Sequence, residues 1–251
     1  MIALPVLVNV AFLTLIERKV LGLSQIRVGP NKVGLWGLLQ PAADAVKLFS
    51  NSFTTLGPIN KTIFFLTPVL RLVLALTLRT LVSSGTGSVL NNLGVLFFII
   101  VLRFNVYPLF GAGWSSNRKY ALIGGLRAIS QTIAYEISLA FILISLLLPR
   151  FTLEFFSLVS PVNLVPLYLL NLLVPLVWVI TVLAELNRTP FDFAEGESEL
   201  VSGFNIEYGS VKFAMIFIAE YAMIYIFRMI SASLIFGLPQ NQTRGLIMSV
   251  S

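Results

Sequence analysis

The sequence predicts an all-α integral membrane protein with about six transmembrane helices and one amphipathic helix on the membrane surface. Hydrophobic residues make up 57% of the 251 residues, charged residues only 11%, and the mean hydropathy is +0.91. A water-soluble domain carries about 25% charged residues. Apolar runs of about 20 residues, the length that crosses a bilayer, recur along the chain. We therefore expect a single membrane domain that covers residues 1–251.

Six apolar runs define the expected spans. The first begins directly after Met1 and ends at Glu17-Arg18-Lys19, so it is short unless it continues to Leu23. It lacks a basic leader and a small-residue cleavage site, and we expect no cleaved signal peptide. The six expected spans are residues 2–16, 62–82, 93–109, 128–148, 164–184 and 211–236.

A polar segment, residues 24–61, separates the first two spans and begins with a turn at Gly29-Pro30. Within residues 35–49 the apolar side chains recur at helical spacing, whereas Asp44 and Lys47 fall elsewhere. This pattern predicts an amphipathic helix that lies along the membrane surface. A second polar stretch, residues 111–127, predicts a loop between the third and fourth spans.

The distribution of basic residues predicts the orientation in the membrane. The loops after spans two and four contain one basic residue between them, Arg150. The segments that follow spans one and three contain nine basic residues, Arg18, Lys19, Arg27, Lys32, Lys47, Lys61, Arg118, Lys119 and Arg127. Basic loops face the inner side of a membrane. The N-terminus is therefore expected on the outer side, and the segment after span five, residues 185–210, on the inner side.

That inner segment is strongly acidic. It contains six of the eleven carboxylates, namely Glu185, Asp192, Glu195, Glu197, Glu199 and Glu207. Thr189-Pro190 predicts the start of a helix, with Thr189 as the N-cap. Such a helix would place Asp192, Glu195 and Glu199 on one face, either as a solvated acidic face or as a working cluster. The glycines and the phenylalanine among the acids, Gly196, Gly203 and Phe204, favour the second interpretation.

Two further acids, Glu136 and Glu220, lie inside apolar spans. A carboxylate at the bilayer centre costs about 2.5–3.5 kcal/mol on insertion scales. That cost is close to the roughly 3.7 kcal/mol that corresponds to a rise in the pKa of a glutamate from about 4.3 to about 7. Each of these acids is therefore a candidate for proton exchange, and the alternative is a structural ion pair with an arginine. Gln131 and Tyr135 share a stripe with Arg127 on span four, and Tyr221 and Tyr225 add hydroxyl groups on span six.

Several motifs resemble one known family. They are Glu17-Arg18-Lys19-Val20-Leu21-Gly22, Gln25-Ile26-Arg27-Val28-Gly29-Pro30-Asn31, Gln40-Pro41 with Asp44 and Lys47, Gly113-Trp114-Ser115-Ser116-Asn117, and Glu195-Gly196-Glu197-Ser198-Glu199-Leu200. Together they resemble the subunit 1 family of NADH–ubiquinone oxidoreductase, in its mitochondrially encoded form, over nearly the whole chain. The Glu-Gly-Glu-Ser-Glu-Leu motif is the most specific of them.

The resemblance implies a subunit of a proton-pumping complex in the mitochondrial inner membrane. In this family the subunit forms much of the ubiquinone tunnel and begins an acidic path for protons. By position, the acidic path corresponds to Glu136, Glu185, Asp192, Glu195, Glu197, Glu199, Glu207 and Glu220. The tunnel corresponds to Arg18, Gln25, Arg27, Asp44 and Phe217.

The resemblance also implies the cofactor and the partners. Ubiquinone is expected as the substrate, in a tunnel shared with other subunits. The sequence has no cysteine or histidine, which excludes the usual ligands of iron–sulfur clusters, haem and zinc. We expect this chain to bind no metal, flavin or iron–sulfur cluster, and to contribute no catalytic residue of its own. The expected partners are the quinone-reducing subunits of the peripheral arm, adjacent small membrane subunits and the lipid bilayer, without nucleic acid.

Other functions remain as alternatives. The nearest is the related subunit of a membrane-bound hydrogenase or a formate-linked complex, which takes electrons from another donor. A free-standing proton or cation transporter should show repeated halves, which the sequence lacks. A purely structural membrane protein would not need acids within its spans.

The sequence departs from the family in two respects. Family members usually have eight spans, and we expect no counterpart of the last two within residues 1–251. Arginines also occupy apolar or small positions, and spans two and three contain no acid to pair with Arg71, Arg79 or Arg103. Because invertebrate mitochondria read AGA and AGG as serine, we hypothesise that several of Arg71, Arg79, Arg103, Arg118, Arg150 and Arg228 are serine in the protein. The alternative is genuine arginines that reach the interface or pair with neighbouring helices and subunits.

Overall fold

The computed structural model describes residues 3–51, 59–83, 93–147, 173–193, 196, 203–205 and 207–236, and these residues form helices and connecting turns without β-strands. The helices are α1 (Ala3–Ser24), α2 (Gln40–Ser50), α3 (Lys61–Ser83), α5 (Gly94–Ser115), α6 (Lys119–Leu147), α8 (Leu173–Glu185) and α10 (Ser210–Phe236). Two short 3-10 helices, η1 (Leu35–Gly37) and η4 (Gly203–Asn205), complete the described elements. The predicted all-α class is confirmed.

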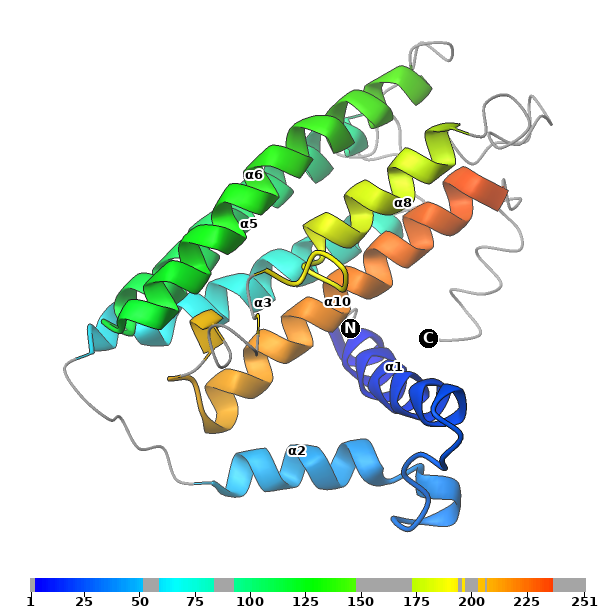
Figure 1. Ribbon diagram of the computed structural model, residues 1–251, viewed down its shortest axis with the longest axis vertical. Coiled ribbons are helices and arrows are strands. Elements are labelled where there is room, and N and C mark those ends of the chain that lie inside the picture. Colours follow the sequence, from blue (N-terminus) through cyan, green and yellow to red (C-terminus); the bar gives the residue numbers. More distant parts are fainter. Residues whose placement is uncertain are drawn as a thin grey trace.

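Five helices, α3, α5, α6, α8 and α10, pack side by side as a bundle (Figure 1). In this part of the chain, α3, α5, α6 and α10 are long and apolar enough to cross a membrane, and α8 is a shorter apolar helix. α3 and α10 lie within one residue of their predicted bounds at each end.

The bundle encloses an apolar core. Phe98 of α5 meets Phe227 of α10 edge to face, with ring centroids 5.6 Å apart, and Trp178 of α8 is also buried in this cluster. The Trp178 indole nitrogen donates to Ser231 Oγ at 3.0 Å, so the one polar atom of this ring has a partner. These contacts join helices that are distant in the sequence, and they fix the position of α8 along α10.

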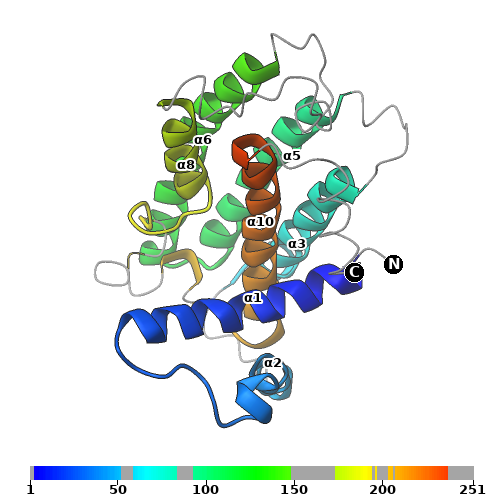
Figure 2. The ribbon, with the colours of Figure 1, turned by 90° about the vertical axis from the view of Figure 1, so that its right-hand side faces the viewer.

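α1 and α2 lie at one end of the bundle. α1 runs across α10 instead of along it, and α2 lies beyond α1 (Figure 2). α1 continues to Ser24, so the first span is not short but extends past Leu23, the second of the two predicted ends. The surface helix begins at Gln40, so the predicted start at residue 35 is wrong. Residues 35–37 instead form a tight turn, because Gly37 has a positive φ of 74° and any Cβ there would collide with the Pro30 carbonyl oxygen.

The predicted loop over residues 111–127 is also wrong. α5 continues to Ser115 and α6 begins at Lys119, so the two helices form a hairpin with a short turn. The glycines in this stretch serve close packing: a Cβ on Gly113 would lie 3.2 Å from Gly125 Cα and 2.8 Å from the Ala121 carbonyl oxygen. Small residues here allow the two backbones to approach, and they do not mark a loop.

α8 ends about halfway along the bundle (Figure 1). Its last turn closes with hydrogen bonds from Arg188 N–H to the Leu183 carbonyl at 3.1 Å and from Asn187 N–H to the Ala184 carbonyl at 3.3 Å. Asn187 has a positive φ of 49°, which is the backbone conformation that ends many helices in this way. The predicted helix start at Thr189 is wrong, because residues 186–193 form turns and the Thr189–Pro190 peptide bond is cis.

Candidate functional site

The structure describes five of the eight predicted acidic-path residues. Glu195, Glu197 and Glu199 lie outside the described residues. Glu136, Glu185, Asp192 and Glu220 come from α6, the end of α8, the turn that follows it and α10. The charge of Glu136 acts on Glu185, and the charge of Asp192 acts on Glu220. Two acidic pairs therefore lie on elements that pack together in the bundle.

Glu220 is largely buried and pairs with an arginine of another helix. Its Oε1 lies 3.0 Å from Arg71 Nη1, and the Arg71 side chain is only 9% exposed. The Arg71 guanidinium also stacks 5.2 Å from the centre of the Phe204 ring. No acid within α3 pairs with Arg71, as expected, but α10 supplies one. This contact is the interhelical pairing that the genuine-arginine alternative requires.

A polar cavity of about 130 Å³ surrounds Glu220. Its walls come from α3, the turn after α8, and α10. The lining residues include Arg71, Asn187, Arg188, Asp192, Phe217, Glu220 and Tyr221. Phe217, predicted for the quinone tunnel, stacks 6.3 Å from Tyr221 and lies in this wall. A polar space of this kind inside an apolar bundle can hold water and pass protons between the groups that line it.

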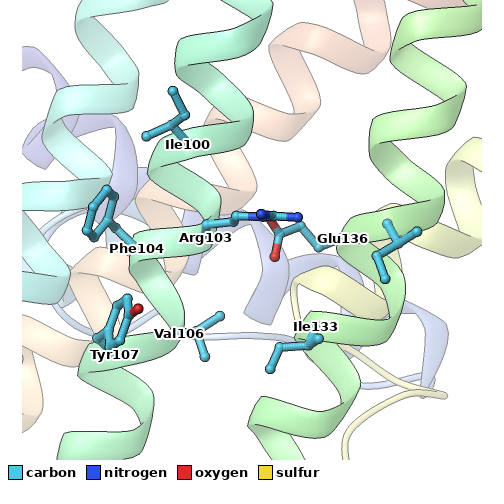
Figure 3. Close-up of a pocket in the computed structure, with 8 residues that line it drawn as sticks. Ile100, Arg103, Phe104, Val106, Tyr107, Ile133 and Glu136 are labelled. Atoms are coloured by element: carbon cyan, nitrogen blue, oxygen red, sulfur yellow. The ribbon is translucent and has the colours of Figure 1, made fainter.

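Glu136 pairs with Arg103 across the α5–α6 hairpin. Glu136 Oε1 accepts a hydrogen bond from Arg103 Nε at 2.9 Å. The carboxylate is 8% exposed, whereas the arginine side chain is 70% exposed. The pair contributes charged groups to a mostly apolar groove of about 490 Å³, whose lining residues include Phe104, Val106 and Tyr107 of α5 and Ile133 of α6. Arg103 and Val106 point from α5 toward α6 (Figure 3).

Glu185 is the most isolated acid among the described residues. The residue is 7% exposed, and its Oε2 has no hydrogen-bond partner in this part of the chain. Glu136 lies close enough to repel a charge on Glu185. Two buried carboxylates that repel each other favour a state in which one of them holds a proton.

Gln131 joins α6 to the start of the acidic segment. Its amide nitrogen donates to the Ala184 carbonyl at 2.8 Å and to the Phe191 carbonyl at 2.7 Å. One helical turn further, the Tyr135 ring packs edge-on against Phe191, with centroids 5.5 Å apart. Two residues of the predicted stripe on span four, Gln131 and Tyr135, thus face the acidic segment.

Arg188 is a site residue that sequence reasoning missed. Its Nη1 donates to Glu17 Oε1 of α1 at 2.8 Å, and its guanidinium lies 4.8 Å from the centre of the Tyr221 ring. Burial opposes its charge, but Tyr221 and Glu17 outweigh burial and raise the pKa of Arg188. The sequence offered one signal for it. Glu17 is an acid within a long apolar helix, α1, and such an acid needs a basic partner, which Arg188 provides.

The remaining acidic-path residue, Glu207, lies at the other end of the acidic segment. Its Oε1 is 3.1 Å from Arg118 Nε, in the α5–α6 turn. The neighbouring Tyr208 hydroxyl contacts Thr67 Oγ1 at 2.9 Å and Ser115 Oγ at 3.4 Å. Burial raises the pKa of the Tyr208 phenol, which keeps the hydroxyl protonated at neutral pH. These contacts hold this end of the segment against α3 and α5.

The other predicted tunnel residues lie on α1, α2 and the segment between them. Arg18 Nη1 is 2.7 Å from Asp44 Oδ2, and Gln40 donates to the second Asp44 oxygen at 2.9 Å. Arg27 donates to Gln25 at 2.8 Å in the exposed segment that follows α1. The structure thus joins α1 to α2 at Asp44, and it separates these residues from Phe217 in the cavity. No group of three or more potential metal ligands occurs among the described residues.

Comparisons with known proteins agree on one family. Residues 1–250 match the family described as NADH dehydrogenase. The NADH-ubiquinone oxidoreductase chain 1 of Balaenoptera physalus is 48% identical over 95% of this chain and 75% of its own length. The protein of the same name from Aedes aegypti is 48% identical over 94% of this chain and 76% of its own length. The Didelphis virginiana protein is 47% identical over 100% of this chain and 79% of its own length.

Proposed function

The chain belongs to the NADH dehydrogenase family, among the chain 1 subunits of NADH–ubiquinone oxidoreductase, and from this membership we propose how it works within complex I. It forms part of the ubiquinone tunnel and the first section of an acidic path that couples quinone reduction to proton translocation. The chain acts in the mitochondrial inner membrane as a multi-pass subunit. The single observation that carries the proposal is the pair of linked acidic sites within an apolar bundle.

The energetic argument starts from the cost of those acids. Each carboxylate at membrane depth costs about 2.5–3.5 kcal/mol unless it is neutralised or paired. Arg71 and Arg103 neutralise Glu220 and Glu136, whereas no cation pairs with Glu185 among the residues that the structure describes. Glu185 is thus the acid that is most easily held in its protonated form. A purely structural cluster would not require such a group.

The path follows from the two acidic pairs. A proton on Glu185 can pass to Glu136 or toward Asp192 and the cavity around Glu220, since all four groups lie on packed elements. Reduction of a quinone consumes protons and changes the charge near its binding site. Arg188, at the start of the acidic segment, donates to Glu17 of α1 and also lines the cavity around Glu220, so a change of charge near the tunnel residues can reach the buried acids through it.

Electron transfer to the quinone requires other subunits. The chain has no cysteine or histidine, so the redox centres that reduce the quinone belong to the peripheral-arm subunits. Arg18, Asp44, Gln25 and Arg27 contribute polar contacts on the inner side, where those subunits bind. This chain binds and orients the quinone and moves protons, and it supplies no electron carrier.

The α5–α6 groove supports a contact with a small membrane subunit. Arg103 is 70% exposed near the middle of α5, too far from either end to reach water easily. Only its Nε bonds to Glu136, and a guanidinium has several more donors that need acceptors. A transmembrane helix of an adjacent subunit with a polar acceptor at this depth fits the groove and satisfies those donors.

The proposal is tested by Glu185→Gln and Glu220→Gln in the assembled complex. We expect NADH–quinone turnover and proton translocation to fall about tenfold or more, as for the loss of a proton-transfer group. Electron transfer from NADH to a hydrophilic artificial acceptor should remain normal. Glu154→Gln is the matched control, since Glu154 lies in the sequence outside the acidic segment and the predicted path. Normal proton translocation in both variants would contradict the proposal.

A further inference from the structure

Gln131 contacts the backbone at two points on either side of the first turn of the acidic segment, one at the end of α8 and one within the segment. Its Nε2 donates at 2.8 Å to the Ala184 carbonyl and at 2.7 Å to the Phe191 carbonyl. Two carbonyl oxygens can only accept hydrogen bonds, so the atom that faces both must be the amide nitrogen. Both donors of this buried side chain are therefore committed to the backbone of the acidic segment.

The two carbonyls have few other partners. α8 stops at Glu185, and the Ala184 carbonyl receives only a long 3.3 Å hydrogen bond from Asn187 N–H within the described backbone. Phe191 lies in a turn, so no regular helix supplies a donor to its carbonyl. Buried backbone carbonyls without donors are unfavourable. Gln131 thus supplies the hydrogen bonds that this irregular backbone lacks.

The position of the two carbonyls has a direct consequence for the acids. The Ala184 carbonyl belongs to the peptide group that leads into Glu185, and the Phe191 carbonyl to the peptide group that leads into Asp192. A hydrogen bond to each carbonyl fixes the plane of that peptide group. One side chain therefore orients the backbone of two carboxylates from different acidic pairs, and Tyr135 reinforces this by packing on Phe191.

We propose that Gln131 is a positioning residue that holds Glu185 and Asp192 in a fixed mutual arrangement, so that a proton can pass from the Glu136–Glu185 pair to the Asp192–Glu220 pair. This inference rests on the proposed proton path and adds to it the residue that sets its geometry. Gln131 does not itself carry the proton in this scheme. Its role is to keep the two pairs within transfer distance while the acidic segment responds to the quinone site.

The test uses two variants in the assembled complex. Gln131→Leu keeps the size of the side chain and removes both donors, and Gln131→Asn keeps the amide but is too short to reach both carbonyls. We expect each to lower quinone-coupled proton translocation about tenfold, because small misplacements of reacting groups slow transfer strongly. Electron transfer to a hydrophilic acceptor should be unchanged. Thr132→Val is the control, since Thr132 is buried beside Gln131 but bonds only to its own helix, at the Ile129 carbonyl.

A third variant separates positioning from simple support. In Gln131→Glu, the charged carboxylate cannot donate to a carbonyl, whereas the protonated carboxyl group has one donor for the two carbonyls. Activity should therefore recover in part as the pH falls, and the unmodified complex should show no such recovery. Full translocation in Gln131→Asn, or a Gln131→Glu pH profile equal to that of the unmodified complex, would overturn the inference. If Glu185→Gln and Glu220→Gln remain fully active, the proposed path itself fails. Loss in those two variants with full activity in the Gln131 variants rejects only the positioning role.

Discussion

At the scale of single residues, buried polar atoms decide how the acidic segment is held. Tyr208 stacks on Phe64, with ring centroids 4.2 Å apart and planes 9° from parallel. Its hydroxyl contacts Thr67 and Ser115, which come from α3 and α5. The three hydroxyls satisfy one another in a place without water access, because each of these side chains is buried.

We predict that Tyr208→Phe destabilises the subunit by about 1–3 kcal/mol, since it leaves the buried hydroxyls of Thr67 and Ser115 without their shared partner. Thermal inactivation of quinone reductase activity should occur at a lower temperature. Tyr120→Phe is the matched control, because Tyr120 is 61% exposed. Equal inactivation temperatures for the two variants would refute the role assigned to this hydroxyl.

Six arginines raise the question of whether the protein itself contains arginine or serine at these positions. Peptide masses of the purified subunit test the serine hypothesis at residues 71, 79, 103, 118, 150 and 228, and the proposed function requires arginine at residues 71 and 103, which pair with Glu220 and Glu136. Tryptic cleavage after residue 118 or 150 would exclude the serine hypothesis at that position. The contacts of Arg71, Arg103 and Arg118 with carboxylates at 2.9–3.1 Å are those that the genuine-arginine alternative requires. Serine at residue 103 would also remove the proposed need for a polar acceptor in the groove.

At the scale of elements, the distance between backbones controls where the acidic segment returns to the bundle. Gly124 of α6 faces η4, and a Cβ on Gly124 would lie 2.8 Å from Gly203 Cα and 3.0 Å from Phe204 N. Gly203 itself has a positive φ of 53°. The described end of the segment is thus seated on α6 through a contact that only glycine allows.

We predict that Gly124→Ala displaces η4 and lowers NADH–quinone activity, because backbone atoms of the segment cannot move aside as a flexible side chain can. Gly209→Ala should be tolerated, since no heavy atom lies within 4 Å of its added Cβ. Limited proteolysis of the assembled complex would report the displacement as faster cleavage near Phe204. Activity in Gly124→Ala equal to that in Gly209→Ala would count against it.

The same elements show how far sequence reasoning reached. Long apolar runs predicted α3 and α10 closely, because a span needs only length and hydrophobicity. The α5–α6 turn was misplaced because Gly113 and Gly125 serve packing between helices, which a single sequence does not reveal. The helix predicted at Thr189 failed because a side chain from α6, Gln131, holds that backbone in turns. The acids within spans were recognised, but their partners depend on the register between helices, which local sequence does not specify.

At the scale of the whole molecule, α2 lies beyond α1 at one end of the bundle (Figure 2), where Ser210 Oγ of α10 donates to the Leu48 carbonyl at 3.2 Å. None of its residues is buried, and Val46 and Phe49 are 67% and 63% exposed. An amphipathic helix of this kind lies at the bilayer surface with its apolar side toward lipid. We propose that a long-chain quinone approaches between α1 and α2 from within the membrane.

We predict that a photoreactive long-chain ubiquinone analogue labels peptides of α1 and α2 around Arg27 and Asp44 in the assembled complex. Excess ubiquinone should suppress the labelling, because the analogue and the substrate share one tunnel. Asp44→Asn should raise the KM for long-chain quinone more than it lowers kcat, since it weakens the contact with Arg18 on the access route. Labelling confined to other subunits would rule out this lateral opening.

Two neighbouring residues of α1 connect the two halves of the site. Glu17 accepts from Arg188, at the start of the acidic segment, and Arg18 pairs with Asp44 on α2, at 2.8 Å and 2.7 Å. A shift of α1 therefore perturbs both contacts at once. By thermodynamic reciprocity, if occupancy of the tunnel changes the proton affinity of the acids by some factor, protonation of those acids must change quinone affinity by the same factor. The dissociation constant of quinone should then depend on pH even where no titrating group touches the quinone.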